Sequence, residues 1–231
     1  MLIAAVIVNE ELTDKARVFR DREHAGSVLS DLLGGFRNSG AFVLGIAAGG
    51  APVAAEVARR LDLSFDVAVV SKITLPWDSE AGYGAVAFDG SVELNETLIE
   101  GLELSELQIE AGIAKTKAKV ERRLEAIRGD TSYSYLQGAT VLLVDDGLAS
   151  GFTMLAGVEA LENIGVGEVI VAVPTASRSA VDRVAPEVSG LYCANLRTGL
   201  PFAVADAYQH WVDVDEEELA RFVSELKKER A

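Results

Sequence analysis

Val-Leu-Leu-Val-Asp-Asp-Gly-Leu-Ala-Ser-Gly-Phe-Thr-Met, residues 141–154, is the stretch that decides the fold. Its first four residues are aliphatic, and a continuous run of this kind is typical of a strand buried on both faces. The apolar pattern from Met154 to Leu161 predicts a helix directly after the loop. A buried strand, a short loop and a helix form the repeating unit of α/β folds with parallel sheets.

The polar residues of this stretch indicate a ligand site. Asp145 and Asp146 stand at the carboxyl end of the strand, the edge at which open parallel sheets bind ligands. The loop that follows opens a helix, whose free N–H groups and dipole favour an anion. We therefore expect a phosphate in the loop and sugar hydroxyls on the carboxylates. The loop residues concerned are Gly147, Ala149, Ser150, Gly151, Phe152 and Thr153. The alternative is an ordinary turn in which Asp or Ser only caps the helix.

Strand and helix patterns alternate along the rest of the chain, which predicts right-handed crossovers between parallel strands. We expect an α/β fold, a mostly parallel sheet flanked by helices with a small hood. Residues 1–231 form one domain in this interpretation, with 73–128 as a loop and helical insertion and 195–231 as hood and C-terminal helix. The expected strands are 2–8, 42–46, 65–70, 141–144, 168–173 and 189–193. The expected helices are 22–33, capped by Asp21, and 52–61, 104–128, 153–164, 178–184 and 216–230. Residues 71–95 are expected to be a long loop with short antiparallel strands.

Composition narrows the classes of function. The chain has 231 residues, 49% hydrophobic and 25% charged, which suits one soluble globular domain with a full-sized core. Its formal net charge of −15 argues against nonspecific binding to nucleic acid or to an anionic membrane. The apolar stretch 2–8 is too short for a membrane span and lacks a basic leader. The expected partner is a small molecule.

The cysteine and histidine content bears on the cellular compartment and on metal binding. Cys193 is the sole cysteine, so no disulfide can form within the chain, and a reducing compartment such as the cytoplasm is expected. We interpret it as a small buried hydrophobe. His24 and His210 match no metal spacing, so no metal centre built from protein ligands is expected. The sequence leaves oligomeric state open, with a homodimer as the commonest arrangement.

The long helix expected over 104–128 carries a cluster of cations that alternates with acids. We interpret this cluster as a solvated helix face, with a binding patch as the alternative. Its members are Lys115, Lys117, Lys119, Arg122 and Arg123.

A second glycine-rich turn lies at 47–50, between the expected strand 42–46 and the expected helix 52–61. Glycines there let the backbone approach a ligand closely. Together with residues 141–154, this turn resembles the type I phosphoribosyltransferases and, over nearly the whole chain from residue 19, a group known as predicted phosphoribosyltransferases. The supporting segments include Phe19-Arg20-Asp21-Arg22, Gly49-Gly50-x-Pro52-Val53-Ala54, Val70-x-Lys72, Gly84-Ala85-Val86-Ala87, Leu94-Asn95-Glu96 and 202–208.

The resemblance implies a role for each matching position. Asp145 and Asp146 would face the ribose hydroxyls, directly or through Mg²⁺, which is the implied cofactor. The loop 147–153 would hold the 5′-phosphate, and Ala48, Gly49 and Gly50 would contact pyrophosphate. Lys72 would supply positive charge to the pyrophosphate. Phe202 or Tyr208 would stack on the acceptor base, unless these rings only pack against the sheet edge.

Two departures from the group separate the leading hypothesis from its alternative. Relatives tend to carry arginine where this chain has Ala48 and Ser71. Because catalysis of phosphoribosyl transfer is largely charge stabilisation, their loss is expected to slow it unless Arg20 or Arg22 compensates. The leading hypothesis is transfer from 5-phosphoribosyl-1-pyrophosphate to a nitrogen acceptor, and the alternative is a non-catalytic phosphoribosyl- or nucleotide-binding regulator. A phosphatase would need Asp-x-Asp, and a Walker-type nucleotide hydrolase would need Gly-Lys-Ser/Thr after a glycine loop.

Overall fold

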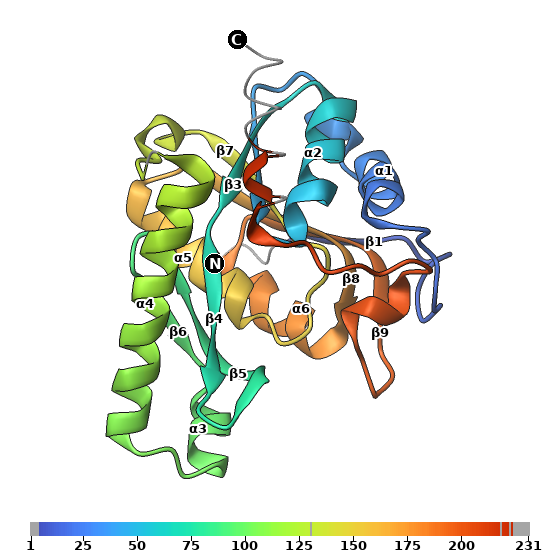
Figure 1. Cartoon of the computed structure of the whole chain (residues 1–231). Coiled ribbons are helices and arrows are strands. Elements are labelled where there is room, and N and C mark those ends of the chain that lie inside the picture. Colours follow the sequence, from blue (N-terminus) through green and yellow to red (C-terminus); the bar gives the residue numbers. More distant parts are fainter. Residues whose placement is uncertain (1–4, 130, 218, 222, 224–231) are drawn as a thin grey trace.

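The structure is a computed structural model that describes residues 5–129, 131–217, 219–221 and 223. In that part of the chain, six parallel strands form one sheet in the order β1-β9-β8-β7-β2-β3. Their bounds are β1 Ala5–Val8, β2 Phe42–Ile46, β3 Ser64–Ala68, β7 Thr140–Val144, β8 Glu168–Ser177 and β9 Gly190–Arg197. Figure 1 shows helices on both faces of this sheet, which confirms the expected α/β class.

Strand β7 shows why the sheet is buried on both faces. Val141 and Leu143 belong to the apolar cluster on one side of the sheet, while Leu142 and Val144 belong to the cluster on the other. Because side chains alternate along a strand, an uninterrupted aliphatic run supplies both layers at once.

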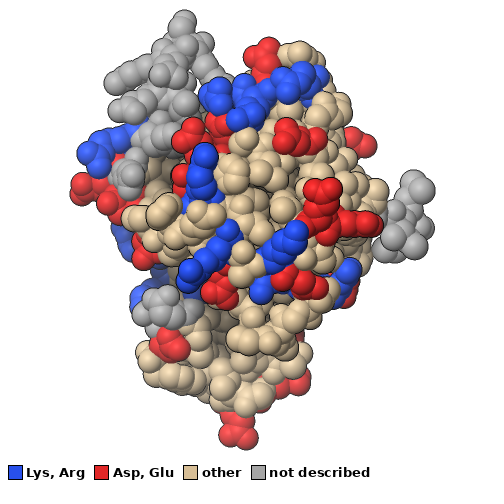
Figure 2. All heavy atoms as spheres, turned by 90° about the vertical axis from the view of Figure 1, so that its right-hand side faces the viewer, with Lys and Arg blue, Asp and Glu red and all other residues tan. Residues whose placement is uncertain are grey.

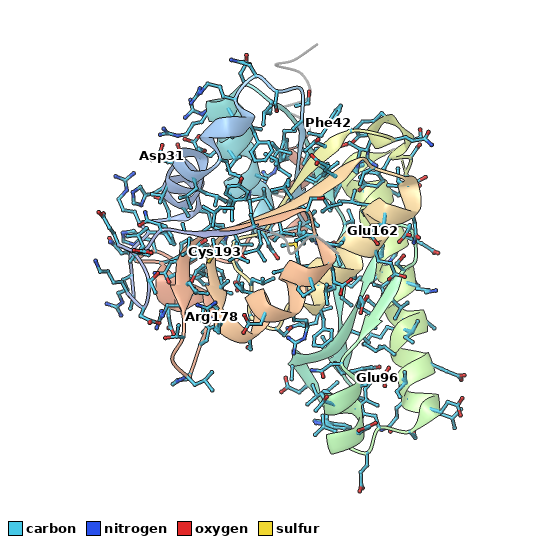
Figure 3. The ribbon with its side chains drawn as sticks, turned by 180° about the vertical axis from the view of Figure 1, so that it is seen from behind. Asp31, Phe42, Glu96, Glu162, Arg178 and Cys193 are labelled. Atoms are coloured by element: carbon cyan, nitrogen blue, oxygen red, sulfur yellow. The ribbon has the colours of Figure 1, made fainter. Side chains whose placement is uncertain are left out.

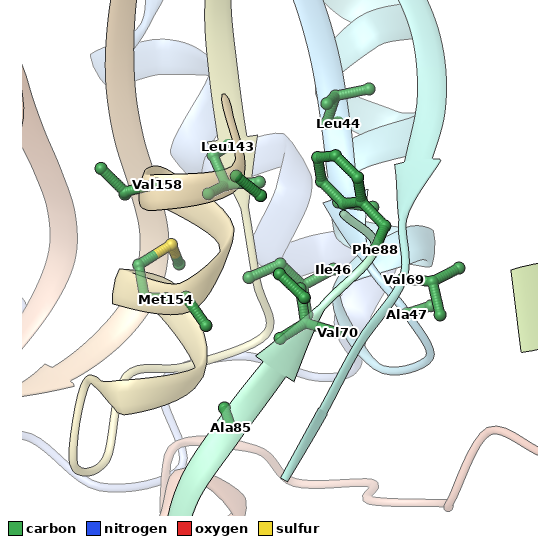
Figure 4. Packing of buried hydrophobic residues seen from close by; sticks show 14 of the residues in the cluster. Leu44, Ile46, Ala47, Val69, Val70, Ala85, Phe88, Leu143, Met154 and Val158 are labelled. Atoms are coloured by element: carbon green, nitrogen blue, oxygen red, sulfur yellow. The ribbon is translucent and has the colours of Figure 1, made fainter. Parts of the chain in front are cut away.

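Helices α1 (Arg22–Leu32) and α2 (Gly50–Leu61) cover one face. Helices α5 (Phe152–Ile164) and α6 (Arg178–Val184) cover the other. Figure 4 shows Met154 and Val158 of α5 beside Leu143 of β7 in this second layer. The predicted cap of α1 is confirmed, since the Asp21 carboxylate accepts the N–H of His24 at 2.8 Å.

A second, antiparallel sheet joins the second layer through Val70 and Ala85, and Figure 4 shows Val70 beside Ile46. It has the order β4-β5-β6 and consists of β4 Val70–Leu75, β5 Asp78–Ala87 and β6 Val92–Leu94. Helix α3 (Glu96–Gly101) leads into the long helix α4 (Glu106–Arg128), which packs on β4 and β5. Figure 3 shows this lobe, marked by Glu96, projecting from the body of the molecule.

Several element bounds differ from those expected. The antiparallel strands expected within residues 71–95 are confirmed, but the long loop is wrong, because β5 spans ten residues and pairs with β4 on one side and with β6 on the other. The expected strand 65–70 is two strands, since the chain leaves the parallel sheet after Ala68. Strand β8 runs past Pro174 to Ser177. Its pairing with β7 ends at Ala172, so the missing proline N–H breaks no bond to that neighbour.

The C-terminal helix expected over 216–230 is only partly covered by the described residues. Helical backbone begins at Glu216, and residues 224–231 lie outside the described residues. Four short 3-10 turns complete the described elements: Gly34–Phe36, Ser134–Leu136, Ala185–Glu187 and Val204–Ala207.

On the surface that faces the viewer in Figure 2, Lys and Arg side chains lie interspersed with Asp and Glu. No helix within the described residues is long and apolar enough to cross a membrane. Cys193 is buried in β9, and burial raises its pKa to about 12, so the thiol is poorly suited to act as a nucleophile.

Candidate functional site

A pocket of about 720 Å³ opens where β2 and β7 end and β4 begins; we call it the strand-end pocket. The chain turns that follow β2 and β7 form two of its walls, and α4 and residues 214–216 form others. Most of the predicted site residues line it: Ala48, Gly49, Lys72, Asp145, Asp146, Gly147, Ala149, Ser150, Gly151 and Thr153. The fold therefore brings together in one cavity two turns that are almost a hundred residues apart in the sequence.

The glycine pair after β2 is required by the aspartates. A Cβ added to Gly49 would lie 2.1 Å from Asp146 Oδ2, and one added to Gly50 would lie 2.7 Å from the Val144 carbonyl oxygen. Since side chains larger than hydrogen cannot fit there, the two turns can approach each other only with glycine at both positions. The peptide bond between Ala47 and Ala48 is cis.

The loop after β7 presents backbone donors to the pocket. Leu148 is fixed to β8, because its N–H donates to the Thr175 carbonyl and its carbonyl accepts the N–H of Ser177. No described acceptor takes the N–H groups of residues 149–151, and those of Phe152 and Thr153 lie in the first turn of α5, where helices leave donors free. An anchored loop with consecutive free amides is suited to holding the oxygens of a phosphate.

Packing also requires a glycine at position 147. A Cβ at this position would lie 2.4 Å from Cγ1 of Val204, whose side chain lies against the loop. The hydroxyl of Ser177 donates to the Ala149 carbonyl and, as the cap of α6, accepts the N–H of Ala180. The loop is thus held from two sides.

The pKa values of both aspartates are raised. Burial, together with the charge of Asp146, raises the pKa of Asp145 well above its usual value. Burial also raises the pKa of Asp146, while the Arg22 guanidinium opposes the shift through contacts of 2.9 Å to Oδ2. Two carboxyls at one strand end with few cations around them are suited to meeting hydroxyl groups or a bound cation.

Arg22 binds Asp146 and the C-terminal segment. Its guanidinium lies 4.0 Å from the centre of the Trp211 ring and donates to the Val212 carbonyl, in addition to holding Asp146. It therefore ties the C-terminal segment to the aspartate pair and does not line the pocket.

Arg123 places a cation beside Ser71, which the sequence alone could not show. The residue is 6% exposed, and its Nη1 donates to the Ser71 hydroxyl at 2.9 Å and to the Val70 carbonyl at 3.1 Å. Its Nε lies 2.7 Å from Oε1 of Glu216, an ion pair without the angle of a hydrogen bond. The prediction that this cation belongs to a solvated helix face is wrong, because α4 packs against β4 at this point.

Lys119 of α4 joins Lys72 and Arg123 in the pocket lining. Sequence reasoning placed only Lys72 there. The signal was the spacing of four residues between Lys119 and Arg123, which puts both on one face of a helix. Nothing in the sequence showed that this face turns toward β4.

Four predicted site residues lie outside the lining. Gly50 packs against the backbone of Asp145, and the Phe152 ring lies 4.7 Å from the Arg183 guanidinium. Phe202 is half-buried and is not among the residues that line the pocket. Tyr208 is 3% exposed, packs beside Phe19 and donates its hydroxyl to the Asp146 carbonyl at 2.6 Å. Tyr208 therefore braces the aspartate loop and has no free face for an acceptor.

A metal ion at this site would need ligands from outside the chain. Within the described residues, no three His, Cys, Asp or Glu side chains gather closely enough to hold a metal ion. Asp145 and Asp146 alone fit Mg²⁺ that keeps most of its shell from ligand oxygens and water, as hydrated Mg²⁺ commonly does.

The chain is similar to known proteins over most of its length. Two curated proteins from two strains of Mycobacterium tuberculosis, provisionally named phosphoribosyl transferases, are each 31% identical to the chain over 215 residues. The aligned part is 93% of this chain and 48% of each relative, so the chain spans about half the length of the curated relatives it matches. The crystal structure of TT1426 from Thermus thermophilus is 32% identical, with a TM-score of 0.71 over 90% of this chain and 98% of that one.

Residues 89–204 match the family described as the phosphoribosyl transferase domain. The matched region is half of the chain and contains both aspartates and the anchored loop after them. The chain therefore belongs to the phosphoribosyl transferase domain family.

Proposed function

We propose that the chain binds 5-phosphoribosyl-1-pyrophosphate with Mg²⁺ in the strand-end pocket and transfers the phosphoribosyl group to a nitrogen acceptor. The observation that carries this proposal is the meeting of three chemistries in one cavity. Free amides of the loop after β7 suit the 5′-phosphate, the aspartate pair suits the ribose hydroxyls, and Lys72 with Arg123 suits the pyrophosphate.

The proposed reaction exchanges one bond for another at the anomeric carbon of the ribose. The acceptor nitrogen gives its lone pair to this carbon, while the bond to the pyrophosphate oxygen breaks and pyrophosphate leaves with that electron pair. The proton from the acceptor nitrogen passes to solvent. Positive charge on the ribose and negative charge on the leaving group grow together, so the carboxylates and the cations would act on opposite ends of one transition state.

Bound Mg²⁺ would neutralise pyrophosphate charge, with Asp145 and Asp146 as its protein contacts. Lys72 would bind the leaving pyrophosphate, and Ala48 and Gly49 would contact it through their backbone. Ser150 and Thr153 would add hydroxyl donors at the 5′-phosphate. The proposed compartment is the cytoplasm. The reason is that the single cysteine is buried and cannot form a disulfide within the chain.

A second candidate is a regulator that binds the same ligand without turnover. Ala48 favours it, because a cation that relatives tend to carry is missing there. Ser71 does not favour the regulator, because the Arg123 guanidinium reaches the Ser71 hydroxyl and supplies a positive charge beside that position. Arg123 therefore favours transfer over binding alone.

The test is a calorimetric titration of the full chain with 5-phosphoribosyl-1-pyrophosphate, with and without Mg²⁺, followed by an assay of pyrophosphate release with a panel of nitrogen bases. We expect binding that Mg²⁺ strengthens and release with at least one base. Binding without release from any base would favour the regulator, and Ala48→Arg would then show whether the missing cation limits turnover. Absence of binding would contradict both candidates.

A further inference from the structure

A second pocket, of about 610 Å³, lies between α4 and the β4–β5 hairpin; we call it the α4 pocket. Its walls come from two elements that the sequence alone did not bring together. One wall is the face of α4 from Leu107 to Arg122, and the other runs along Lys72 to Pro76 and includes Tyr83 of β5. None of the residues assigned to the phosphate loop or the aspartate pair belongs to it.

One side of the α4 pocket is basic. Lys115, Lys119 and Arg122 follow one another at spacings of four and three along α4, so they share a face of the helix. Within the described residues, none of these three side chains forms an ion pair, and no Asp or Glu belongs to the lining. In a chain with net charge −15, a concave surface whose described charged residues are all cations favours an anionic ligand.

The other side of the α4 pocket is apolar. Leu75, Pro76 and Ala111 line it, and Leu107 remains 77% exposed at its margin. Gly112 allows the wall to form, because a Cβ there would lie 2.0 Å from the Tyr83 hydroxyl oxygen. Small-molecule sites combine apolar walls with a few convergent polar groups in this way.

Lys72 and Lys119 line both pockets, so the α4 pocket adjoins the proposed pyrophosphate end of the strand-end pocket. The stem of Lys72 crosses β5 at Gly82, where an added Cβ would lie 2.2 Å from Lys72 Cγ. The glycine leaves room for a lysine that faces the junction of the two cavities. Ligands in the two pockets would lie next to each other.

We propose that the α4 pocket binds the acceptor, and that this acceptor is an organic anion with an apolar body. The identification as acceptor rests on the proposed function, because it requires the phosphoribosyl donor in the neighbouring pocket. The negative charge of the acceptor would lie against Lys115 and Arg122, its apolar body against Leu75 and Ala111, and its nitrogen toward the junction.

The test uses two fluorescent probes that differ by one charged group. The first is 8-anilino-1-naphthalenesulfonate, and the second is N-phenyl-1-naphthylamine, which lacks the sulfonate. Each is titrated at low salt into the full chain, into the double variant Lys115→Gln with Arg122→Gln, and into Lys117→Gln. The last variant is the matched control, because Lys117 lies on the same helix but does not line the pocket.

We expect the sulfonate probe to bind the parent and Lys117→Gln alike, and the double variant about fivefold to tenfold more weakly, since two exposed cation contacts are lost. The uncharged probe should not distinguish the three proteins. A further variant, Ala111→Phe, fills the pocket from an exposed position without changing charge and should weaken the sulfonate probe too. Equal binding of the sulfonate probe to the parent, the double variant and Ala111→Phe would overturn the proposal.

Saturation with 5-phosphoribosyl-1-pyrophosphate and Mg²⁺ separates this inference from the proposed function. We expect the sulfonate probe to stay bound, because donor and acceptor must be present together. Displacement of the probe would overturn the assignment of the α4 pocket to an acceptor. If calorimetry shows no binding of the donor to the parent, the proposed function fails, and with it the acceptor role, while the probe titrations still decide whether the pocket selects anions.

Discussion

The strand-end pocket and the α4 pocket present positive character to a ligand in different ways. At its phosphate end the first relies on backbone N–H groups of one short loop, fixed by hydrogen bonds to Thr175 and Ser177 of β8, and it adds side-chain cations only at its other end. The second relies on side-chain cations along a helix, opposite an apolar wall. Amides in a fixed loop favour one phosphate at one place, whereas lysine and arginine side chains can follow anions of different shapes. The difference suggests a donor site of fixed geometry beside a more adaptable acceptor site.

The largest expected effect tests the donor side of this comparison. Asp145→Asn with Asp146→Asn should weaken binding of 5-phosphoribosyl-1-pyrophosphate at least a hundredfold. Hydrogen bonds to charged groups contribute about 1.5–3 kcal/mol each, and two would be lost. The measurement is calorimetry, with circular dichroism to show that the fold is retained. Asp31→Asn, an exposed carboxyl on α1, is the matched control and should bind like the parent. Unfolding of the double variant at ordinary temperature would instead assign the pair a structural role.

The sequence was sufficient to predict those parts of the site whose residues are neighbours in the chain. Residues 141–154 contain the strand, both aspartates and the loop in order, and the structure places them as expected. The aliphatic run predicted a strand buried on both faces, and the side chain of Asp21 predicted a helix cap, because both effects act within a few residues.

The sequence was insufficient where a residue acts on a distant one. Ser71 looked like a lost cation until α4 was found to bring Arg123 against it, 52 residues later in the chain. Nothing near Gly147 in the sequence showed that Val204 lies against the loop and leaves no room for a side chain there. Tyr208 looked like an acceptor platform, but it is covered by Phe19. In each case tertiary packing decided what a local pattern could not.

The next largest effect tests whether Arg123 serves the pyrophosphate. Arg123→Met should weaken binding of 5-phosphoribosyl-1-pyrophosphate about tenfold to a hundredfold, because a charge-assisted contact worth ~1.5–3 kcal/mol is removed. Ribose 5-phosphate, which has no pyrophosphate, should bind the parent and the variant alike. Calorimetry with both ligands makes the comparison. Equal losses for both would show that Arg123 only supports the fold between α4 and β4.

A variant of Glu216, the ion-pair partner of Arg123, is expected to have the opposite effect. Its carboxylate lies 2.7 Å from Arg123 Nε and is 52% exposed, so it would compete with a bound pyrophosphate for the guanidinium. Glu216→Gln should strengthen pyrophosphate binding about twofold to fivefold, the range expected for a partly exposed ion pair. Weaker binding in this variant would mean that Glu216 positions Arg123 and does not compete.

An effect smaller than that of Arg123→Met is expected in the phosphate loop, where several amides share the ligand. Thr153→Val keeps the shape of the side chain and removes one hydroxyl donor. Affinity for 5′-phosphate ligands should fall about threefold to tenfold, since one hydrogen bond contributes ~0.5–1.5 kcal/mol. Unlike Arg123→Met, this change should affect ribose 5-phosphate and 5-phosphoribosyl-1-pyrophosphate equally. Thr140→Val, at the other end of β7, is the control. Unchanged affinity for both ligands in Thr153→Val would remove its hydroxyl from the site.

The smallest effect concerns stability and follows from the raised pKa of Asp145. A carboxyl whose pKa is higher in the folded than in the unfolded chain binds protons preferentially when folded, so stability falls as pH rises from the unfolded pKa through the folded one. Above both values the penalty is fully present. Asp145→Asn removes it, and an asparagine Oδ1 can still accept the N–H of Asp146 as the carboxylate does.

Scanning calorimetry without ligand should therefore show a higher melting temperature for Asp145→Asn than for the parent at neutral pH. The gain should be about 2–4 °C for each kcal/mol of penalty removed, and it should shrink as the pH is lowered toward the usual range of aspartate. Asp31→Asn should melt like the parent throughout. A lower melting temperature for Asp145→Asn at neutral pH would mean that the carboxylate stabilises the fold. Asp145 would then have a structural role in the strand-end pocket and not a ligand-binding one.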